Sequence, residues 1–157
     1  MRATKTNSRD SSDTGLRLGL ALILLWALAC AAATAQDVIL VANKSVSISQ
    51  ITSTQVRELF TGVHSRFSDG SRAVPVTLKG GPTHEVFLRN YVGEDPAEFR
   101  LRWRKAVFTG QGAMLKELRS ESDLLNYVAA TPGAIGYVSR VTAPDTVKVL
   151  TVLKSPY

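Results

Sequence analysis

The stretch AVPVTLKGGPTH, residues 73–84, decides the fold class of this chain. Its first half, Ala73–Leu78, is rich in apolar and β-branched residues and predicts a short strand. Lys79–Thr83 ends that strand with two glycines and a proline, and it leads into a predicted helix over 84–91 that Gly93 stops. A strand that passes through a glycine-rich turn into a helix is a building unit of α/β proteins.

Further strands and helices are predicted on both sides of this unit. The other strands are expected over 37–42, 134–139 and 146–153, and the other helices over 53–60, from 96 onward and over 123–130. The predicted order is therefore β-α-β-α-α-α-β-β. Such an order indicates a sheet with helices packed on its faces and crossover connections between some of its strands.

Two helix starts carry strong local signals. Thr52 and Gln55 have the spacing of a capping box at the helix over 53–60, which Gly62 ends. Asp95 and Glu98 have the same spacing, and the proline between them suits the first position of a helix. Both helices are therefore predicted with defined first residues.

The helix that follows Asp95 has an apolar face and a basic cluster. Its apolar face is predicted to pack and consists of Phe99, Trp103, Ala106 and Val107. The basic cluster consists of Arg100, Arg102, Arg104 and Lys105. It is compatible with an ordinary solvated helix face and, alternatively, with docking of a partner.

Tyr137, in the strand over 134–139, is compatible with packing in the core or with lining a cleft.

The N-terminus predicts export. Residues 1–17 are polar and basic, residues 18–36 are uncharged, and the apolar segment closes with Ala33-Thr34-Ala35. This pattern is typical of a secretory signal over 1–35 that is cleaved after Ala35, which would place the protein in the periplasm. Two alternatives are open: a retained membrane anchor, because the segment approaches the length of a bilayer span, and a lipid on Cys30. Contact with a membrane is expected only in these two cases.

The remaining residues, 36–157, have the length of one domain. They contain no cysteine, because Cys30 is the only one in the chain, so a disulfide is excluded. They carry 15 lysines and arginines against 11 acidic residues, a net charge of +4. This modest positive charge favours anionic ligands and is too small and too scattered to indicate nucleic acid.

No catalytic or metal-binding constellation is present in the sequence. The two histidines, His64 and His84, lie apart and are each expected to be a surface or capping residue. A zinc site would need further ligands at suitable spacing, and no serine lies in a nucleophile-elbow pattern. We therefore expect neither an enzyme nor a metal or cofactor.

The candidate ligand site is the loop Lys79–Thr83. Gly80 and Gly81 would let backbone N–H groups approach a ligand, and the helix start behind them favours an anion. Thr83 would add a hydroxyl and Lys79 a charge. The alternative is an ordinary turn between strand and helix, with Thr83 as its cap.

Several segments resemble the phosphate-binding proteins of ABC transporters. Residues 131–138, TPGAIGYV, resemble their "pGAIGYv" signature, and residues 55–62, QVRELFTG, resemble their "IFxG" helix. Phe87, Trp103 and Phe108-Thr109-Gly110 follow in the expected order. The resemblance covers residues 37–153.

The resemblance implies a reduced type II periplasmic-binding-protein-like fold and a non-enzymatic module related to phosphate uptake. The family's arginine, which three residues separate from Ser-Gly-Thr, corresponds to Thr77, its serine to Gly81 and its glycine to Pro82. Only Thr83 keeps the family residue. The implied partners are phosphate or another small anion and an ABC permease. The alternative is an envelope interaction protein that keeps the scaffold without the ligand.

Overall fold

The central strand of the structure is β1 (Val38–Ala42), whose apolar residues are buried on both sides. The structure is a computed structural model that describes residues 37–110, 115–140 and 145–154. The predicted signal segment and its cleavage after Ala35 lie outside the described residues.

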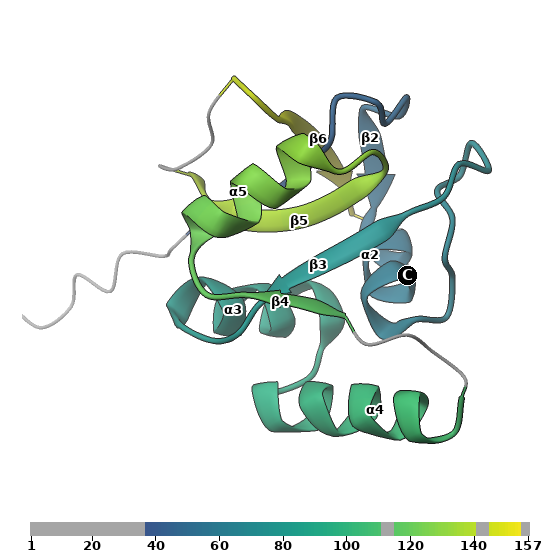
Figure 1. Cartoon of the computed structure of the whole chain (residues 1–157), viewed down its shortest axis with the longest axis vertical. Helices are drawn as coiled ribbons and strands as arrows, with labels where there is room; N and C mark the ends of the chain where they lie inside the picture. The colour runs from purple at the N-terminus through teal and green to yellow at the C-terminus, as the bar shows by residue number, and fades with distance from the viewer. Residues whose placement is uncertain (1–36, 111–114, 141–144, 155–157) are drawn as a thin grey trace, which may run out of the picture. The chain divides into compact units, whose positions relative to one another are not determined.

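The described strands form one mixed sheet of six, in the order β2-β6-β1-β5-β3-β4 (Figure 1). β1 is antiparallel to both of its neighbours, β5 and β6, whereas β3 is parallel to β5 and to β4. β2 is parallel to β6. The strands other than β1 are β2 (Gln50–Thr52), β3 (Val74–Leu78), β4 (Lys116–Leu118), β5 (Ala134–Ser139) and β6 (Lys148–Leu153).

Helices cover both faces of this sheet (Figure 1). They are α2 (Ser53–Thr61), α3 (Pro82–Phe87), the π-helix η1 (Leu88–Val92), α4 (Pro96–Phe108) and α5 (Glu121–Ala130). The side chains of β5 show which helix covers which face. Gly136 faces Leu124 of α5, whereas the ring of Tyr137 contacts Phe60 of α2 and Phe87 of α3 on the opposite side. The predicted α/β sheet with helices on its faces is confirmed.

The two predicted capping boxes are present. Thr52 and Gln55 exchange hydrogen bonds at the start of α2, and Gly62 ends the helix with a φ of 77°. Asp95 and Glu98 do the same at the start of α4.

The start of α3 differs from the prediction. The helix begins at Pro82, with Gly81 before it at a φ of 97° and no side-chain cap. Thr83 therefore lies within the first turn of α3 and is not its cap. Gly93 ends the π-helix η1, as expected for a helix stopped at that glycine.

The prediction that the whole apolar face of α4 packs against the core is wrong in part. Phe99 is buried and Trp103 packs against the core, but the Val107 side chain is 40% exposed. The physical reason is that α4 contacts the remaining structure only along one narrow line, near α2 and α3, so the edge of its apolar face meets solvent. Arg102, predicted as part of a solvated cluster, is exposed and pairs with Glu94.

Candidate functional site

The loop Lys79–Thr83 connects β3 to α3 at the end of the sheet near β4. Lys79, Gly80 and Gly81 are exposed, whereas Thr83 is buried. The Lys79 backbone N–H donates to Leu118 O of β4 at 2.8 Å, which fixes the first residue of the loop. The four predicted site residues thus lie together, three at the surface and one beneath them.

Beneath the loop, Thr83 contacts a carboxylate that the sequence analysis did not single out. Its hydroxyl donates to Glu121 Oε1 at 2.6 Å. The other oxygen of Glu121 accepts from the backbone N–H of Ser139 at 3.1 Å and from its hydroxyl at 2.7 Å. Glu121 is the first residue of α5 and Ser139 the last of β5. Two hydroxyls and one N–H therefore converge on a single negatively charged group.

This arrangement restricts which anions can lie next to Thr83. A carboxylate at this position repels a fully ionised oxyanion, because like charges in a partly buried site are screened poorly. It can accept a hydrogen bond from an oxyanion that keeps a proton. Pro82 in addition offers no N–H, so the head of α3 has fewer donors than a helix usually presents.

A second polar cluster is buried one layer deeper. The Tyr137 hydroxyl lies 2.7 Å from Thr77 Oγ1 and 2.5 Å from His84 Nδ1, and it accepts from the Leu78 N–H at 3.1 Å. The ring of Tyr137 stacks on Phe87 with centroids 3.7 Å apart. Tyr137 therefore packs in the core, where hydrogen bonds of its hydroxyl link β5 to β3 and to α3.

The structure corrects the expectation that His84 is a surface or capping residue: its exposed fraction is 2%. Burial, with a smaller contribution from the positive charge of Arg100, lowers the pKa of His84 to about 4. A neutral imidazole can accept a hydrogen bond from the Tyr137 hydroxyl at Nδ1. Burial also raises the pKa of the Tyr137 hydroxyl far above its ordinary value. His64, in contrast, lies at the surface beside Glu58, as expected.

We expect His84 to make the stability of the fold depend on pH. The unfolded chain binds a proton at His84 near its ordinary pKa of 6.5, whereas the folded chain binds it only near 4. Stability is therefore complete above pH 6.5 and falls as the pH drops from 6.5 toward 4, by as much as about 3 kcal/mol. Urea denaturation at a series of pH values measures this loss. His84→Gln should remove most of the slope and His64→Gln should not; an unchanged slope in His84→Gln would contradict the assignment.

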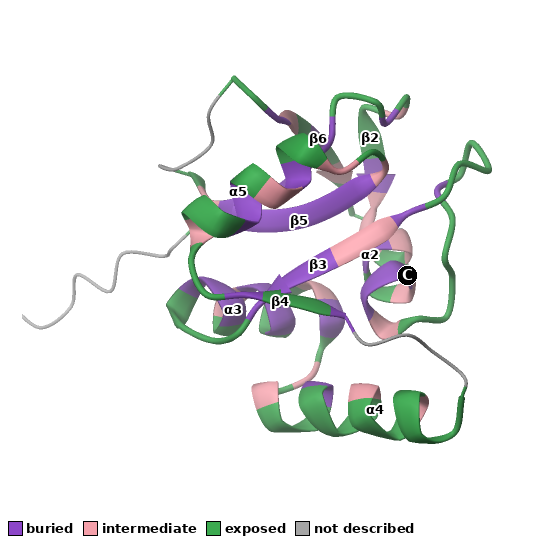
Figure 2. Cartoon of the chain, in the orientation of Figure 1, coloured by how far each residue is buried: buried purple, intermediate pink, exposed green. Residues whose placement is uncertain are grey.

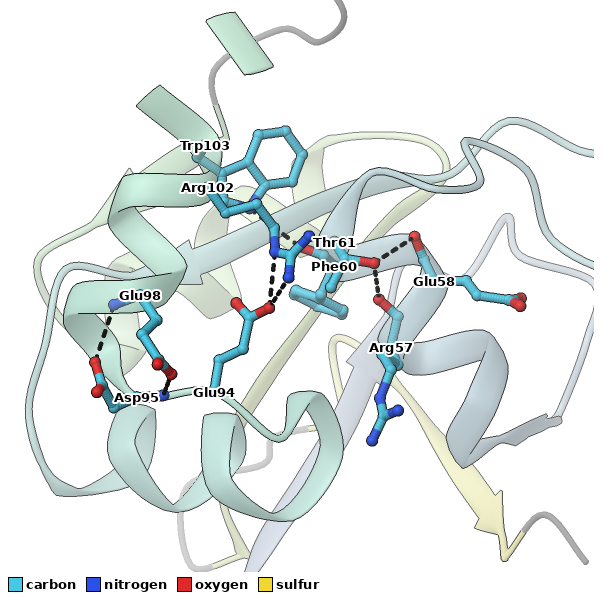
Figure 3. A network of polar contacts seen from close by, with 9 residues as sticks. All are labelled: Arg57, Glu58, Phe60, Thr61, Glu94, Asp95, Glu98, Arg102 and Trp103. Atoms are coloured by element: carbon cyan, nitrogen blue, oxygen red, sulfur yellow. Dashed lines mark hydrogen bonds and ion pairs between the residues drawn. The ribbon is translucent and has the colours of Figure 1, made fainter. Parts of the chain in front are cut away.

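Two side chains of α4 form polar contacts outside the helix (Figure 3). Arg102 binds Glu94, which lies just before the helix, and Trp103 Nε1 donates to Phe60 O at the end of α2. A groove of about 1070 Å³ lies beside this junction. Its lining includes the end of α2 with the loop after it, the start of β3, α4 residues such as Leu101 and Lys105, and Lys116 and Tyr127. None of the loop residues 79–83 lines it, so the candidate anion loop is an open surface site separate from the groove.

Within the residues that the structure describes, no group of three or more His, Cys, Asp or Glu side chains could hold a metal ion. No helix in the same part of the chain is long and apolar enough to cross a membrane.

The fold is similar to part of the fold of solved substrate-binding proteins of phosphate ABC transporters. The chain matches a phosphate ABC transporter substrate-binding protein with bound phosphate from Clostridium perfringens, with a TM-score of 0.59 and 18% identity over 73% of this chain and 44% of that one. It also matches PstS from Borrelia burgdorferi, with a TM-score of 0.56 and 14% identity over 76% of this chain and 49% of that one.

No family model matches the sequence, and no curated protein matches it. The chain spans about half the length of the solved structures that share its fold. At these identities the likeness shows the reduced periplasmic-binding-protein-like fold that the sequence resemblance implied.

Proposed function

We propose that this chain is an exported, non-enzymatic binding module that takes a small oxyanion, phosphate, at the loop Lys79–Thr83. The observation that carries the proposal is the exposed backbone of Gly80 and Gly81 at the head of α3, with Thr83 buried in the first turn of that helix. Lys79 would supply the charge that attracts the anion. The fold shared with phosphate-binding proteins of transporters supports this choice of ligand.

Glu121 makes the proposal specific about the ligand. Its carboxylate accepts the Thr83 hydroxyl, so an anion bound here must tolerate a negative neighbour. Phosphate keeps at least one proton near neutral pH and can donate it to a carboxylate, whereas sulfate has none to donate. We therefore expect phosphate to bind and sulfate to fail, at low salt.

Calorimetric titration of the exported chain, with its N-terminus determined by mass spectrometry, tests this. Thr83→Ala combined with Lys79→Ala should abolish the phosphate signal, because it removes the only side-chain hydroxyl and the charge proposed to contact the anion. Thr83→Ser keeps the hydroxyl and should keep binding. As a matched control, Lys44→Ala with Thr146→Ala changes the same residue types at exposed positions elsewhere. Unchanged affinity in the Thr83/Lys79 double variant would exclude this loop as the site.

A second candidate function is an envelope interaction protein that keeps the scaffold without a ligand. The specific observation in its favour is that the carboxylate of Glu121 already receives the hydroxyls of Thr83 and Ser139. In that case the wild type gives no heat with phosphate, whereas Glu121→Ala frees the donors and gains weak phosphate binding. The search for partners would then turn to proteins, among them an ABC permease.

Export itself belongs to the proposal. The signal over 1–35 and its cleavage after Ala35 would release the module into the periplasm, whereas an uncleaved segment or a lipid on Cys30 would leave it tethered to the membrane. The mass of the N-terminal peptide of the exported chain distinguishes these three cases.

A further inference from the structure

The outward surface of α4 carries exposed apolar and basic side chains that have no role in the proposed function. Leu101, Arg104, Lys105 and Phe108 follow one another at i, i+3, i+4 and i+7 spacing and so share one side of the helix. This side, the outer α4 face, is opposite Phe99, which is buried toward the core.

The two apolar residues of the outer α4 face are among the most exposed of the large apolar residues that the structure describes. Phe108 is 93% exposed and Leu101 is 60% exposed. Figure 2 shows most of α4 as exposed, apart from the side that turns toward the other helices. Leu101 also lines the groove beside α4. Two large exposed apolar side chains in one line on a helix indicate an interaction site more than scattered surface residues do.

The cations beside these side chains are unpaired within the described part of the chain. Arg104 and Lys105 lie on either side of the line from Leu101 to Phe108, and neither forms an ion pair among the described residues. The neighbouring carboxylates are turned to other partners. Glu94 binds Arg102, and Glu98 accepts a hydrogen bond from the backbone N–H before the helix. The outer α4 face therefore presents apolar groups between two cations that pair with none of the described acids.

We propose that the outer α4 face docks on the surface of a membrane that contains anionic phospholipid. Leu101 and Phe108 enter the boundary between headgroups and acyl chains, while Arg104 and Lys105 extend to the lipid phosphates at the same depth. These two unpaired cations beside one line of apolar side chains suit an anionic lipid surface, whereas a protein partner would have to provide acidic groups on both sides of an apolar line. Because only two apolar side chains insert, the binding is reversible.

Vesicle binding tests the proposal with the full chain as it is recovered after export. Vesicles of phosphatidylcholine mixed with phosphatidylglycerol should bind it at low salt, and vesicles of phosphatidylcholine alone should bind it much less. Leu101→Ser with Phe108→Ser should weaken the partitioning by roughly tenfold or more, and Arg104→Gln with Lys105→Gln by roughly tenfold. High salt should reduce binding of the wild type and have less effect on the Arg104/Lys105 variant.

Matched controls distinguish vesicle binding by the outer α4 face from non-specific binding through any exposed apolar or basic residue. Val149→Ser with Leu153→Ser removes two exposed apolar residues from β6, and Lys44→Gln with Lys154→Gln removes the same charge elsewhere. Both should bind as the wild type does. Equal losses in the controls and in the α4 variants would overturn the proposal, as would equal binding to neutral vesicles.

A local readout keeps the test decisive if the N-terminal apolar segment is retained and binds vesicles by itself. A spin label at Phe108→Cys, in a Cys30→Ser chain, should lie at the depth of the acyl boundary, and a label at Ser68→Cys should stay in water. A label at 108 that remains in water refutes the proposal. A dimer in solution that Leu101→Ser with Phe108→Ser dissociates would show instead that a second copy covers this face.

Discussion

Gly133→Ala is expected to destabilise the fold by more than about 3 kcal/mol. Gly133 has a φ of 74°, and a Cβ atom built on it would lie 2.5 Å from the backbone oxygen of Arg72. That oxygen cannot easily move away, because the Val74 N–H donates to Gly133 O at 2.9 Å and holds the two chain segments together. The variant therefore combines backbone strain with a clash against backbone.

Urea denaturation of the wild type and of two glycine variants measures this effect. Gly70→Ala is the matched control, because Gly70 has a similar φ of 81° and no atom within 4 Å of its Cβ position. It should cost only about 1–2 kcal/mol, the strain of the left-handed backbone alone. If the two variants lose the same stability, the contact with Arg72 is relieved at no cost and our account of Gly133 is wrong.

Tyr137→Phe is expected to cost about 2–4 kcal/mol, because the hydroxyl serves several buried partners at once. Without it, the Leu78 N–H, which donates to this oxygen at 3.1 Å, has lost its acceptor in the core. Thr77 and His84 lose a partner as well. The stacking of the ring on Phe87 is preserved, so the loss reports the hydroxyl and not the packing.

Tyr127→Phe is the control for this substitution. The Tyr127 ring is half buried, and its hydroxyl forms no hydrogen bond among the described residues. Thermal and urea unfolding should place Tyr127→Phe within about 0.5 kcal/mol of the wild type. A similarly small effect in Tyr137→Phe would mean that water replaces the hydroxyl beside Leu78, and the buried cluster would then not hold β3 to β5.

Features encoded within a few residues were predictable from the sequence. The capping boxes at Thr52 and Asp95 need only a pair of residues three apart, and the glycines at 62 and 93 end helices by their own backbone freedom. The buried strand over 38–42 was recognisable as a continuous apolar run. Such signals do not depend on the rest of the fold.

Features that depend on tertiary contacts were not predictable in the same way. β2 and β4 have three residues each, too few to show any periodicity. His84 lies beside Tyr137, 53 residues away, and only this contact explains why a histidine at a helix start is buried. Thr83 lies beside Glu121, 38 residues away, so the carboxylate of the candidate site carried no local signal.

The position of β1 between β5 and β6 has a consequence for how the chain acquires its structure. β1 is the first described element, yet Val41 pairs with Gly136 and with Val149 near the other end of the sequence. Contacts at such separation form slowly, because a long loop must close before they are gained. During synthesis the central strand therefore has no neighbours until nearly the last residues are made. On the export route proposed above, such a chain would reach the translocation machinery while it is still extended, and it would complete its sheet only after its C-terminal strand had followed.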